Sequence, residues 1–293
     1  MNELTPQRLK ELNEIAARVR GHVLVAVHKA GGGHVGGPLS CTDMLTALYF
    51  HVLNIDPSRP DWEERDLFVL SKGHSTIALY SVMAERGYFA VEELLTYDAI
   101  DSRLQGHPDM SKTPGIDMSS GSLGQGISAG VGMALGAKLL KKPFRTYVLL
   151  GDGESQEGQV WEAAFVAARY RLDNLTVILD YNGLQQFGWQ KPGEHMLPPI
   201  ENPTLKWQAF GWNTLEINGH NIHEFVSAIQ ASQQTQGKPT IIVAHTTKGK
   251  GVSFMEDQFD WHARVPTNDE LATALDELGQ TGLFQESMAG GQS

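Results

Sequence analysis

A strand–helix–strand unit near the middle of the chain constrains the fold more than any other segment. Two apolar runs rich in β-branched residues, Thr146–Leu150 and Leu175–Leu179, predict buried strands. The segment between them has apolar residues at the spacing of one helix face, namely Val160, Trp161, Ala164, Phe165 and Ala168. Parallel strands joined by one crossover helix end at the same edge of the sheet. The carboxyl ends of these two strands are therefore predicted to lie side by side.

Polar residues suited to a metal follow both strands. Asp152 lies between Gly151 and Gly153 after the first strand, and Asn182 follows the second. Ligands of open α/β sheets bind at this edge. Mg²⁺ binds a few protein oxygens, here including a backbone carbonyl such as that of Leu184, and its remaining ligands are phosphate and water oxygens. The two glycines let backbone N–H groups approach a diphosphate. Either turn alone is typical of an ordinary turn, but the pair predicts a metal-bound diphosphate.

The sequence around these turns resembles a known family. The segment GDGESQEGQVWEAA, with Asn182 after it, resembles the transketolase version of the thiamine diphosphate signature, and the resemblance extends from about His28 to about Pro266. It implies bound thiamine diphosphate and Mg²⁺, or Ca²⁺ or Mn²⁺ in its place. The implied metal ligands are Asp152, Asn182 and the Leu184 carbonyl, with Gly153 near the diphosphate.

Five histidines lie in predicted loops, where a single histidine is most often a solvated polar residue. The resemblance separates them. His34 in GGGHVGGP and His107 in GHP resemble substrate-contacting histidines, His74 in LSKGH resembles one that meets the diphosphate, and His262 in WHARVP resembles one near both. Imidazoles suit sugars because each offers a donor and an acceptor and transfers protons near neutral pH. His34, His107 and His262 are thus the predicted catalytic residues, and His220 is given no catalytic part.

Four more residues are predicted to contact the cofactor. The glycine-rich segment 121–129 matches a dinucleotide fingerprint only weakly, because no apolar strand precedes it; the resemblance places Gly121 and Leu123 on the cofactor instead. Glu157 suits the first turn of a helix, and the resemblance implies an interface glutamate that links two cofactor sites. Lys248 follows a strand and is predicted to meet a phosphate, with a solvated loop lysine as the alternative.

Composition excludes several classes of protein. A net charge of −11 argues against a nucleic-acid or anionic-membrane surface. The single cysteine, Cys41, excludes an internal disulfide and suits a reducing cytoplasm. No apolar run approaches the ~20 residues that cross a bilayer, and the polar first residues contain no signal core. We expect a soluble cytoplasmic protein that binds neither nucleic acid nor membrane.

Alternating strands and helices predict a doubly wound α/β fold, with a mostly parallel sheet covered by helices on both faces. We expect one domain over residues 1–287 and a disordered tail at 288–293. Three local features complete the prediction: a break over 31–38 that no regular element tolerates, a helix over 43–53, and a helix over 124–140 that is buried because its residues are small.

The activating carboxylate of a thiamine enzyme is absent from the predicted site. In transketolases it belongs to a different domain, and full-length members are roughly twice this length. The resemblance therefore implies the N-terminal subunit of a split transketolase, inactive alone, which forms a heterotetramer with a C-terminal pyrimidine-binding subunit. Together they would transfer a two-carbon ketol unit between the sugar phosphates of the pentose phosphate pathway. The alternatives are the α subunit of a 2-oxo acid dehydrogenase, a deoxyxylulose-type synthase and a non-catalytic cofactor-binding subunit.

Overall fold

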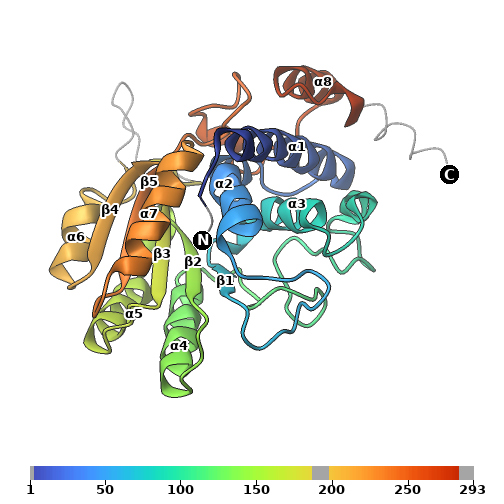
Figure 1. Cartoon of the computed structure of the whole chain (residues 1–293). Helices are drawn as coiled ribbons and strands as arrows, with labels where there is room; N and C mark the ends of the chain where they lie inside the picture. The colour runs from blue at the N-terminus through green and yellow to red at the C-terminus, as the bar shows by residue number, and fades with distance from the viewer. Residues whose placement is uncertain (1–2, 187–197, 284–293) are drawn as a thin grey trace.

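Five parallel strands form one sheet at the centre of the molecule (Figure 1). The computed structural model describes residues 3–186 and 198–283. The strands lie in the order β1–β2–β3–β5–β4, and their bounds are Leu67–Leu70 for β1, Thr146–Gly151 for β2, Leu175–Tyr181 for β3, Asn213–Asn218 for β4 and Thr240–His245 for β5. All four strand pairs are parallel, so every carboxyl end lies at one edge. The α/β prediction is confirmed, and the described sheet is wholly rather than mostly parallel.

Helices cover both faces of the sheet, as the doubly wound prediction requires. One face carries α1 (Pro6–Ala30), α2 (Gly36–Ala47), α3 (Thr76–Arg86) and α7 (Ile222–Gln234), with α8 (Asn268–Glu277) packed on α1. The other face carries α4 (Gln125–Leu139), α5 (Gly158–Arg169) and α6 (Pro203–Ala209). The two layers of helices therefore enclose the sheet and leave its carboxyl edge to the loops.

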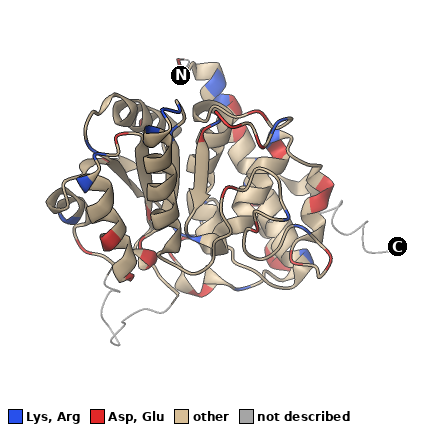
Figure 2. Cartoon of the chain, turned by 90° about the horizontal axis from the view of Figure 1, so that it is seen from below, with Lys and Arg blue, Asp and Glu red and all other residues tan. Residues whose placement is uncertain are grey.

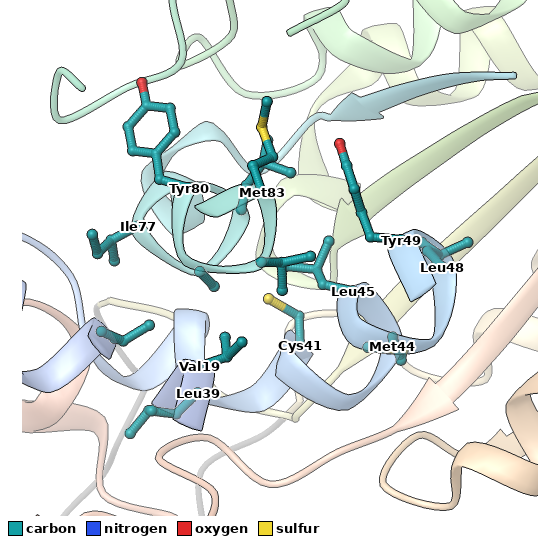
Figure 3. Close-up of a cluster of buried hydrophobic side chains, with 14 of the residues drawn as sticks. Val19, Leu39, Cys41, Met44, Leu45, Leu48, Tyr49, Ile77, Tyr80 and Met83 are labelled. Carbon is teal, nitrogen blue, oxygen red and sulfur yellow. The ribbon is translucent and has the colours of Figure 1, made fainter. Parts of the chain in front are cut away.

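The strands divide the core in two because side chains alternate between the faces of a sheet. In β2, Tyr147 and Leu149 belong to the core under α1–α3, whereas Val148 and Leu150 belong to the core under α4–α6. Figure 3 shows the first core where α1, α2 and α3 meet. Its side chains there are fully or almost fully buried: Val19, Leu39, Cys41, Met44, Leu45, Leu48, Tyr49, Ile77, Tyr80 and Met83.

Two helix starts follow the capping rules that the sequence indicates. Thr5 caps α1 by accepting a hydrogen bond from the Arg8 backbone, and Pro6 occupies its first turn. Thr267 and Glu270 form a capping box at the start of α8.

The prediction that no regular element includes residues 31–38 is wrong for residues 36–38. Helix α2 begins at Gly36, so Gly36, Gly37 and Pro38 form its first turn. The predicted start of the helix at residue 43 was therefore seven residues too late, and the helix continues into a π-helical turn, Leu48–Val52. A proline is tolerated in a first turn. The glycines are needed for close packing, because a Cβ at Gly36 would lie 2.8 Å from the Lys248 side chain.

The prediction that the helix over 124–140 is buried is also wrong for one of its faces. Helix α4 buries Gly126, Ile127, Gly130, Val131, Ala134 and Ala137. Leu139 and Leu140 remain 79% and 70% exposed. The small residues let the helix backbone approach the sheet closely: a Cβ at Gly130 would collide with Val148, and one at Gly126 with Ser71. The small residues therefore reflect the close approach of one face of α4 to the sheet, and not burial of the whole helix.

Charged residues of both signs are interspersed along the chain (Figure 2). Within the described ranges, no helix combines the length and the apolar character needed to cross a membrane. The single domain over residues 1–287 stays a prediction, and the tail at 288–293 lies outside the described residues.

Candidate active site

The carboxyl ends of β2 and β3 bring Asp152 next to the turn that contains Asn182. Asp152 is 3% exposed, and its two carboxylate oxygens accept hydrogen bonds from the backbone N–H groups of Gly153 (2.7 Å) and Gly183 (2.6 Å). The Asn182 side-chain oxygen accepts one from the Leu184 backbone at 3.1 Å. The predicted proximity of the two strand ends is confirmed. That Asp152, Asn182 and the Leu184 carbonyl bind a metal stays a prediction.

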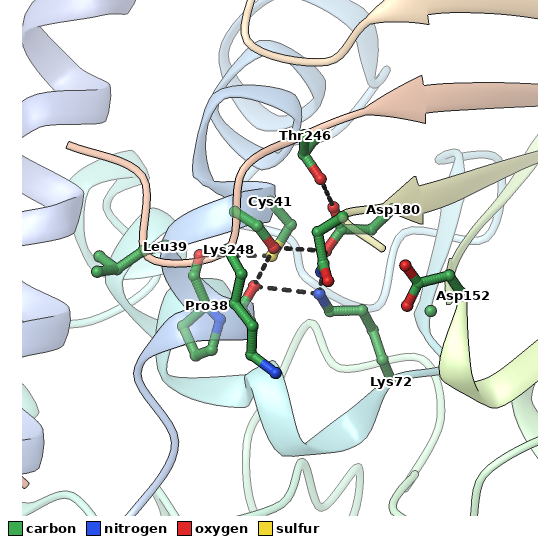
Figure 4. Close-up of polar contacts among 12 residues, drawn as sticks. Pro38, Leu39, Cys41, Lys72, Asp152, Asp180, Thr246 and Lys248 are labelled. Carbon is green, nitrogen blue, oxygen red and sulfur yellow. Dashed lines mark hydrogen bonds and ion pairs between the residues drawn. The ribbon is translucent and has the colours of Figure 1, made fainter. Parts of the chain in front are cut away.

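A buried ion pair lies beside Asp152 (Figure 4). The Asp180 carboxylate, near the end of β3, accepts hydrogen bonds from Ser40 Oγ at 2.6 Å and from the side chains of Lys72 and Thr246. Burial alone would raise the pKa of Asp180, but the Lys72 ammonium, together with the hydrogen bonds from Lys72, Ser40 and Thr246, lowers that pKa below its ordinary value. Burial likewise opposes the charge of Lys72, yet the Asp180 carboxylate raises the pKa of Lys72 above its ordinary value. Lys72 and Asp180 are therefore both charged.

Among the described residues, Asp152 forms no ion pair of its own, although the Lys72 charge lowers its pKa slightly against the other effects. Burial, followed by repulsion from the Asp180 carboxylate, raises the pKa of Asp152 to about 7. A divalent cation at this point would supply the missing positive charge, and a carboxylate, an amide oxygen and a backbone carbonyl are the hard oxygen ligands that Mg²⁺ prefers. The described residues contain no group of three or more His, Cys, Asp or Glu side chains that could hold a metal unaided. These donors therefore fit a cation that shares its remaining ligands with a diphosphate.

Glu154 joins three segments behind the Asp152 turn. Its buried carboxylate accepts hydrogen bonds from Ser71 Oγ (2.5 Å) and from the backbone N–H groups of Gly124 (2.8 Å) and Gly151 (3.0 Å). These groups belong to the end of β1, to the segment that enters α4 and to the end of β2. One carboxylate thus fixes three loops that face the same cavity.

The cavity at the carboxyl edge has a volume of about 610 Å³, which is the size of a small-molecule or cofactor site. It is lined by His34, Lys72 and Glu154 and by all the predicted cofactor and metal residues: His74, Gly121, Leu123, Asp152, Gly153, Glu157, Asn182, Leu184, Lys248 and His262. The structure therefore brings these residues into one cavity. Glu157 precedes α5 as its N-cap residue rather than lying in its first turn.

Three histidines form a cluster in this cavity. The ring centres of His34, His74 and His262 lie 5.1–5.2 Å from one another. Burial and then the neighbouring His107 and Lys248 lower the pKa of His34 to about 4. Burial, followed by Lys248, lowers the pKa of His262 to about 3, and burial also lowers the pKa of His74. At neutral pH the cluster therefore consists of uncharged imidazoles, each with one donor and one acceptor nitrogen.

His107 lies apart from this cluster. Its ring centre is 6.4 Å from that of His34, and it lines an adjoining cavity of about 630 Å³. His34 lines both cavities. Of the three predicted catalytic histidines, His34 and His262 therefore share the main cavity, and His107 faces the neighbouring one.

Lys248 is buried and is not the solvated loop lysine that the sequence left as an alternative. It is 1% exposed, and its Nζ lies 2.9 Å from Nδ1 of His262. Burial, the largest of the effects on this group, lowers the pKa of Lys248 to about 8. The side chain is therefore mostly an ammonium at neutral pH. An ammonium can only donate, so Nδ1 of His262 accepts, and the ring proton is on Nε2.

We predict that the Lys248→Met substitution stabilises the chain at pH 7. The pKa of Lys248 is lowered from 10.5 to about 8, so burying its ammonium costs stability, by about 1–3 kcal/mol. This cost is present in full below pH 8 and is relieved as the pH rises towards the unfolded-state pKa of about 10.4. Urea unfolding of both proteins at several pH values measures the difference.

The control for this prediction is Lys250→Met. Lys250 is partly exposed and forms an ion pair with Glu256, so its replacement should change stability by less than about 1 kcal/mol. A Lys248→Met protein less stable than the parent at pH 7, or an advantage that stays constant up to pH 10, would contradict the prediction.

Sequence reasoning missed Lys72, Asp180 and Glu154. A positional signal was present for each, since Lys72 follows the strand β1, Asp180 directly follows the predicted strand Leu175–Leu179, and Glu154 directly follows Gly151-Asp152-Gly153. Their partners could not be inferred, because Lys72 and Asp180 are 108 residues apart in the chain.

Comparison with known proteins agrees with this geometry. Residues 12–285 match the family model described as the transketolase thiamine diphosphate-binding domain. The chain is 45% identical to the 6-deoxy-6-sulfo-D-fructose transketolase subunit SqwG of Clostridium sp. (strain MSTE9), over 93% of this chain and 98% of that one. It is 42% identical to one subunit of the apulose-4-phosphate transketolase of Phocaeicola vulgatus, over 89% and 91% of the two chains.

Full-length transketolases match over a smaller share of their own length. Human transketolase is 40% identical over 89% of this chain but only 41% of its own. The solved transketolase of Leishmania mexicana superposes with a TM-score of 0.85 at 27% identity, covering 95% of this chain and 44% of the other. The Campylobacter jejuni transketolase superposes with a TM-score of 0.84 at 29% identity, covering 99% and 48%. The chain thus spans less than half of these proteins. It belongs to the transketolase family, and the part of that family to which it corresponds is the N-terminal, thiamine diphosphate-binding domain.

Proposed function

We propose that this chain is the diphosphate-binding subunit of a two-chain transketolase, which transfers a two-carbon ketol unit from a ketose phosphate to an aldose phosphate. One observation carries the proposal. The oxygen donors Asp152 and Asn182 share a single cavity with the uncharged imidazoles of His34, His74 and His262. A metal-held diphosphate and a polyhydroxylated substrate need these two kinds of group side by side.

Thiamine diphosphate and Mg²⁺ are the groups that the cavity would hold. Asp152, Asn182 and the Leu184 carbonyl would bind the metal, and the backbone of Gly153 would approach the diphosphate without a Cβ in the way. The other proposed cofactor contacts are His74, Gly121, Leu123, Glu157, Lys248 and His262. When bound, the cofactor supplies the carbanion stabilisation that cleavage of a carbon–carbon bond requires.

The histidines would handle protons and hydroxyl groups. His262 keeps its proton on Nε2 because Nδ1 accepts from Lys248, so it can donate to a substrate oxygen at neutral pH. His34 is likewise uncharged and can donate or accept. His107 lines the adjoining cavity, where it would contact the hydroxyl groups farther along the sugar.

A partner chain would supply the carboxylate that hydrogen-bonds the aminopyrimidine. Among the residues that the structure describes, three carboxylates line the cavity. Asp152 and Glu154 are buried and already accept backbone hydrogen bonds, whereas Glu157 lies exposed at the rim. The two relatives described above that this chain matches over more than nine-tenths of their own length are named as subunits. The proposed assembly is a heterotetramer with a pyrimidine-binding subunit, and Glu157 would link two cofactor sites across the interface.

The relatives' names supply candidate donors besides the pentose phosphates. One is named for 6-deoxy-6-sulfo-D-fructose and the other for apulose 4-phosphate, and both sugars present hydroxyl groups that neutral imidazoles can bind. We place this activity in the cytoplasm, which suits the free, buried Cys41.

The test combines the chain with its candidate pyrimidine-binding partner, thiamine diphosphate and Mg²⁺. Xylulose 5-phosphate, apulose 4-phosphate and 6-deoxy-6-sulfofructose are each offered as donor with an aldose phosphate acceptor, and aldose release is measured. We expect turnover only with both chains present. Turnover by this chain alone would contradict the split arrangement. A mixture that binds the cofactor in calorimetry but turns over none of the three donors would favour a non-catalytic subunit. If that mixture instead decarboxylated pyruvate, the result would favour a 2-oxo acid enzyme.

A further inference from the structure

His220 takes part in a buried network behind the cavity. This histidine follows β4, and its side chain is 14% exposed. Its Nδ1 lies 2.8 Å from Oδ2 of Asp43 on α2, and its Nε2 accepts a hydrogen bond from the Thr247 backbone N–H at 2.8 Å. Asp43 also accepts two hydrogen bonds from Arg20 on α1, at 3.0 and 2.6 Å. The network therefore connects two helices to the loop that follows β5.

The partners of His220 determine where its ring proton lies. Burial alone would raise the pKa of Asp43, but the Arg20 guanidinium and the bond to His220 lower that pKa to about 2, so Asp43 is ionised and can only accept. His220 must therefore donate through Nδ1. The Thr247 N–H is a donor, so Nε2 must carry a lone pair. Both requirements are met by the neutral tautomer with its proton on Nδ1.

The Thr247 backbone leads directly to the cavity. The next residue is Lys248, whose Nζ contacts His262 and whose stem packs against Gly36. The loop has other backbone anchors, from Thr246 to Tyr181 at 3.1 Å and from Gly249 to Gly36 at 3.0 Å. Between them, the Lys248 carbonyl accepts a hydrogen bond from the Asp257 backbone at 3.0 Å, and His220 is the acceptor for the Thr247 N–H.

We propose that His220 is a positioning residue, which holds the Thr247 peptide so that Lys248 reaches Nδ1 of His262. The proposal deepens the function proposed above and rests on it for its catalytic consequence. Its structural content, which concerns one tautomer and one side-chain contact, can be tested without substrate, cofactor or partner.

The first test uses the unaltered chain. A long-range ¹H–¹⁵N spectrum of the imidazoles at pH 7 distinguishes the two neutral tautomers. We expect the proton of His220 on Nδ1 and that of His262 on Nε2, each signal being assigned by its loss in the corresponding His→Asn variant. A proton on Nε2 of His220 would overturn the proposal, whether or not the chain proves to be a transketolase.

Two substitutions test the roles of Nδ1 and Nε2 of His220 separately. His220→Asn keeps a donor near Asp43 but removes the acceptor for Thr247, whereas His220→Gln can place an amide oxygen near the Nε2 position. We expect His220→Asn to shift the His262 ring signals and to lower kcat of the two-chain enzyme by about 10- to 100-fold, as small misplacements do. His220→Gln should retain most of kcat and the parent His262 spectrum.

The matched control is His223→Asn, because His223 lies exposed on the first turn of α7. It should leave both readouts unchanged. If His220→Asn kept the parent His262 spectrum, or if His220→Gln lost as much kcat as His220→Asn, the positioning role would be wrong. A two-chain enzyme without activity would instead contradict the proposed function and leave the spectral test valid.

Discussion

Alanine in place of Asp152 should abolish Mg²⁺-dependent binding of thiamine diphosphate. Asp152 is the only carboxylate among the proposed ligands. Its side chain is 3% exposed, so bulk water cannot take its place easily. Loss of an outer-shell partner already weakens metal sites by about 10- to 100-fold, so we expect at least about 100-fold weaker binding when this ligand is lost. Calorimetry on the two-chain mixture, with and without Mg²⁺, measures the effect.

Two further variants make this result specific. Asp152→Asn keeps an oxygen that can accept from Gly153 or Gly183 but removes the charge, so it should fold as the parent does and still bind the cofactor weakly. Asp276→Ala alters an exposed carboxylate at the end of α8 and should bind normally. If a folded Asp152→Ala protein bound the cofactor as the parent does, Asp152 would not be a metal ligand.

Methionine in place of Lys72 should destabilise the chain by about 3–5 kcal/mol, because removal of one partner of a buried ion pair leaves the other charge uncompensated. Lys72 is 2% exposed and Asp180 is fully buried. Without the ammonium, Asp180 keeps the hydroxyl donors of Ser40 and Thr246 but loses its ion-pair partner and still lies beside the Asp152 carboxylate (Figure 4). Urea unfolding at pH 7 measures the loss.

The pH dependence of the Lys72→Met effect has a definite sign. In the parent the pKa of Asp180 is lowered on folding, so its contribution to stability is complete above the unfolded-state pKa of about 3.9 and is lost as the pH falls through the folded pKa. In Lys72→Met the carboxyl should protonate more readily, so the difference between the two proteins should shrink in acid.

Two controls accompany the Lys72→Met measurement. Adding Asp180→Asn should restore part of the stability, because the double variant has no unpaired charge at this position. Lys142→Met disrupts a surface pair with Glu63, which is 84% exposed, and should cost less than about 1 kcal/mol. A Lys72→Met protein as stable as Lys142→Met would show that the buried pair contributes nothing.

Local patterns predicted the elements better than their ends or their surroundings. The start of α2 was missed because glycines and a proline normally interrupt a helix, whereas here the glycines allow Lys248 to pack against the first turn. Burial of the whole of α4 was inferred from its small residues, but those residues allow only one face of the helix to pack closely on the sheet. In both places the deciding neighbour is far away in the sequence.

The site shows the same division. Asp152 and Asn182 could be predicted because each directly follows a strand of a crossover unit, and parallel pairing brings such strand ends together. His220 was left without a role, because its partners Asp43 and Thr247 lie 177 and 27 residues away. A side chain whose effect depends on what it touches cannot be assigned from its own segment.

The sequence by itself determined the parallel α/β layers, the metal-capable pair at the sheet edge and the resemblance to transketolases, since each depends on the order and spacing of neighbouring residues. Only the tertiary structure decided which charges are paired, which histidines share a cavity and where their protons lie. The physical reason is that burial and contact set these properties. Asp180 remains a carboxylate because Lys72 is buried against it, and His262 has its acceptor nitrogen fixed by Lys248.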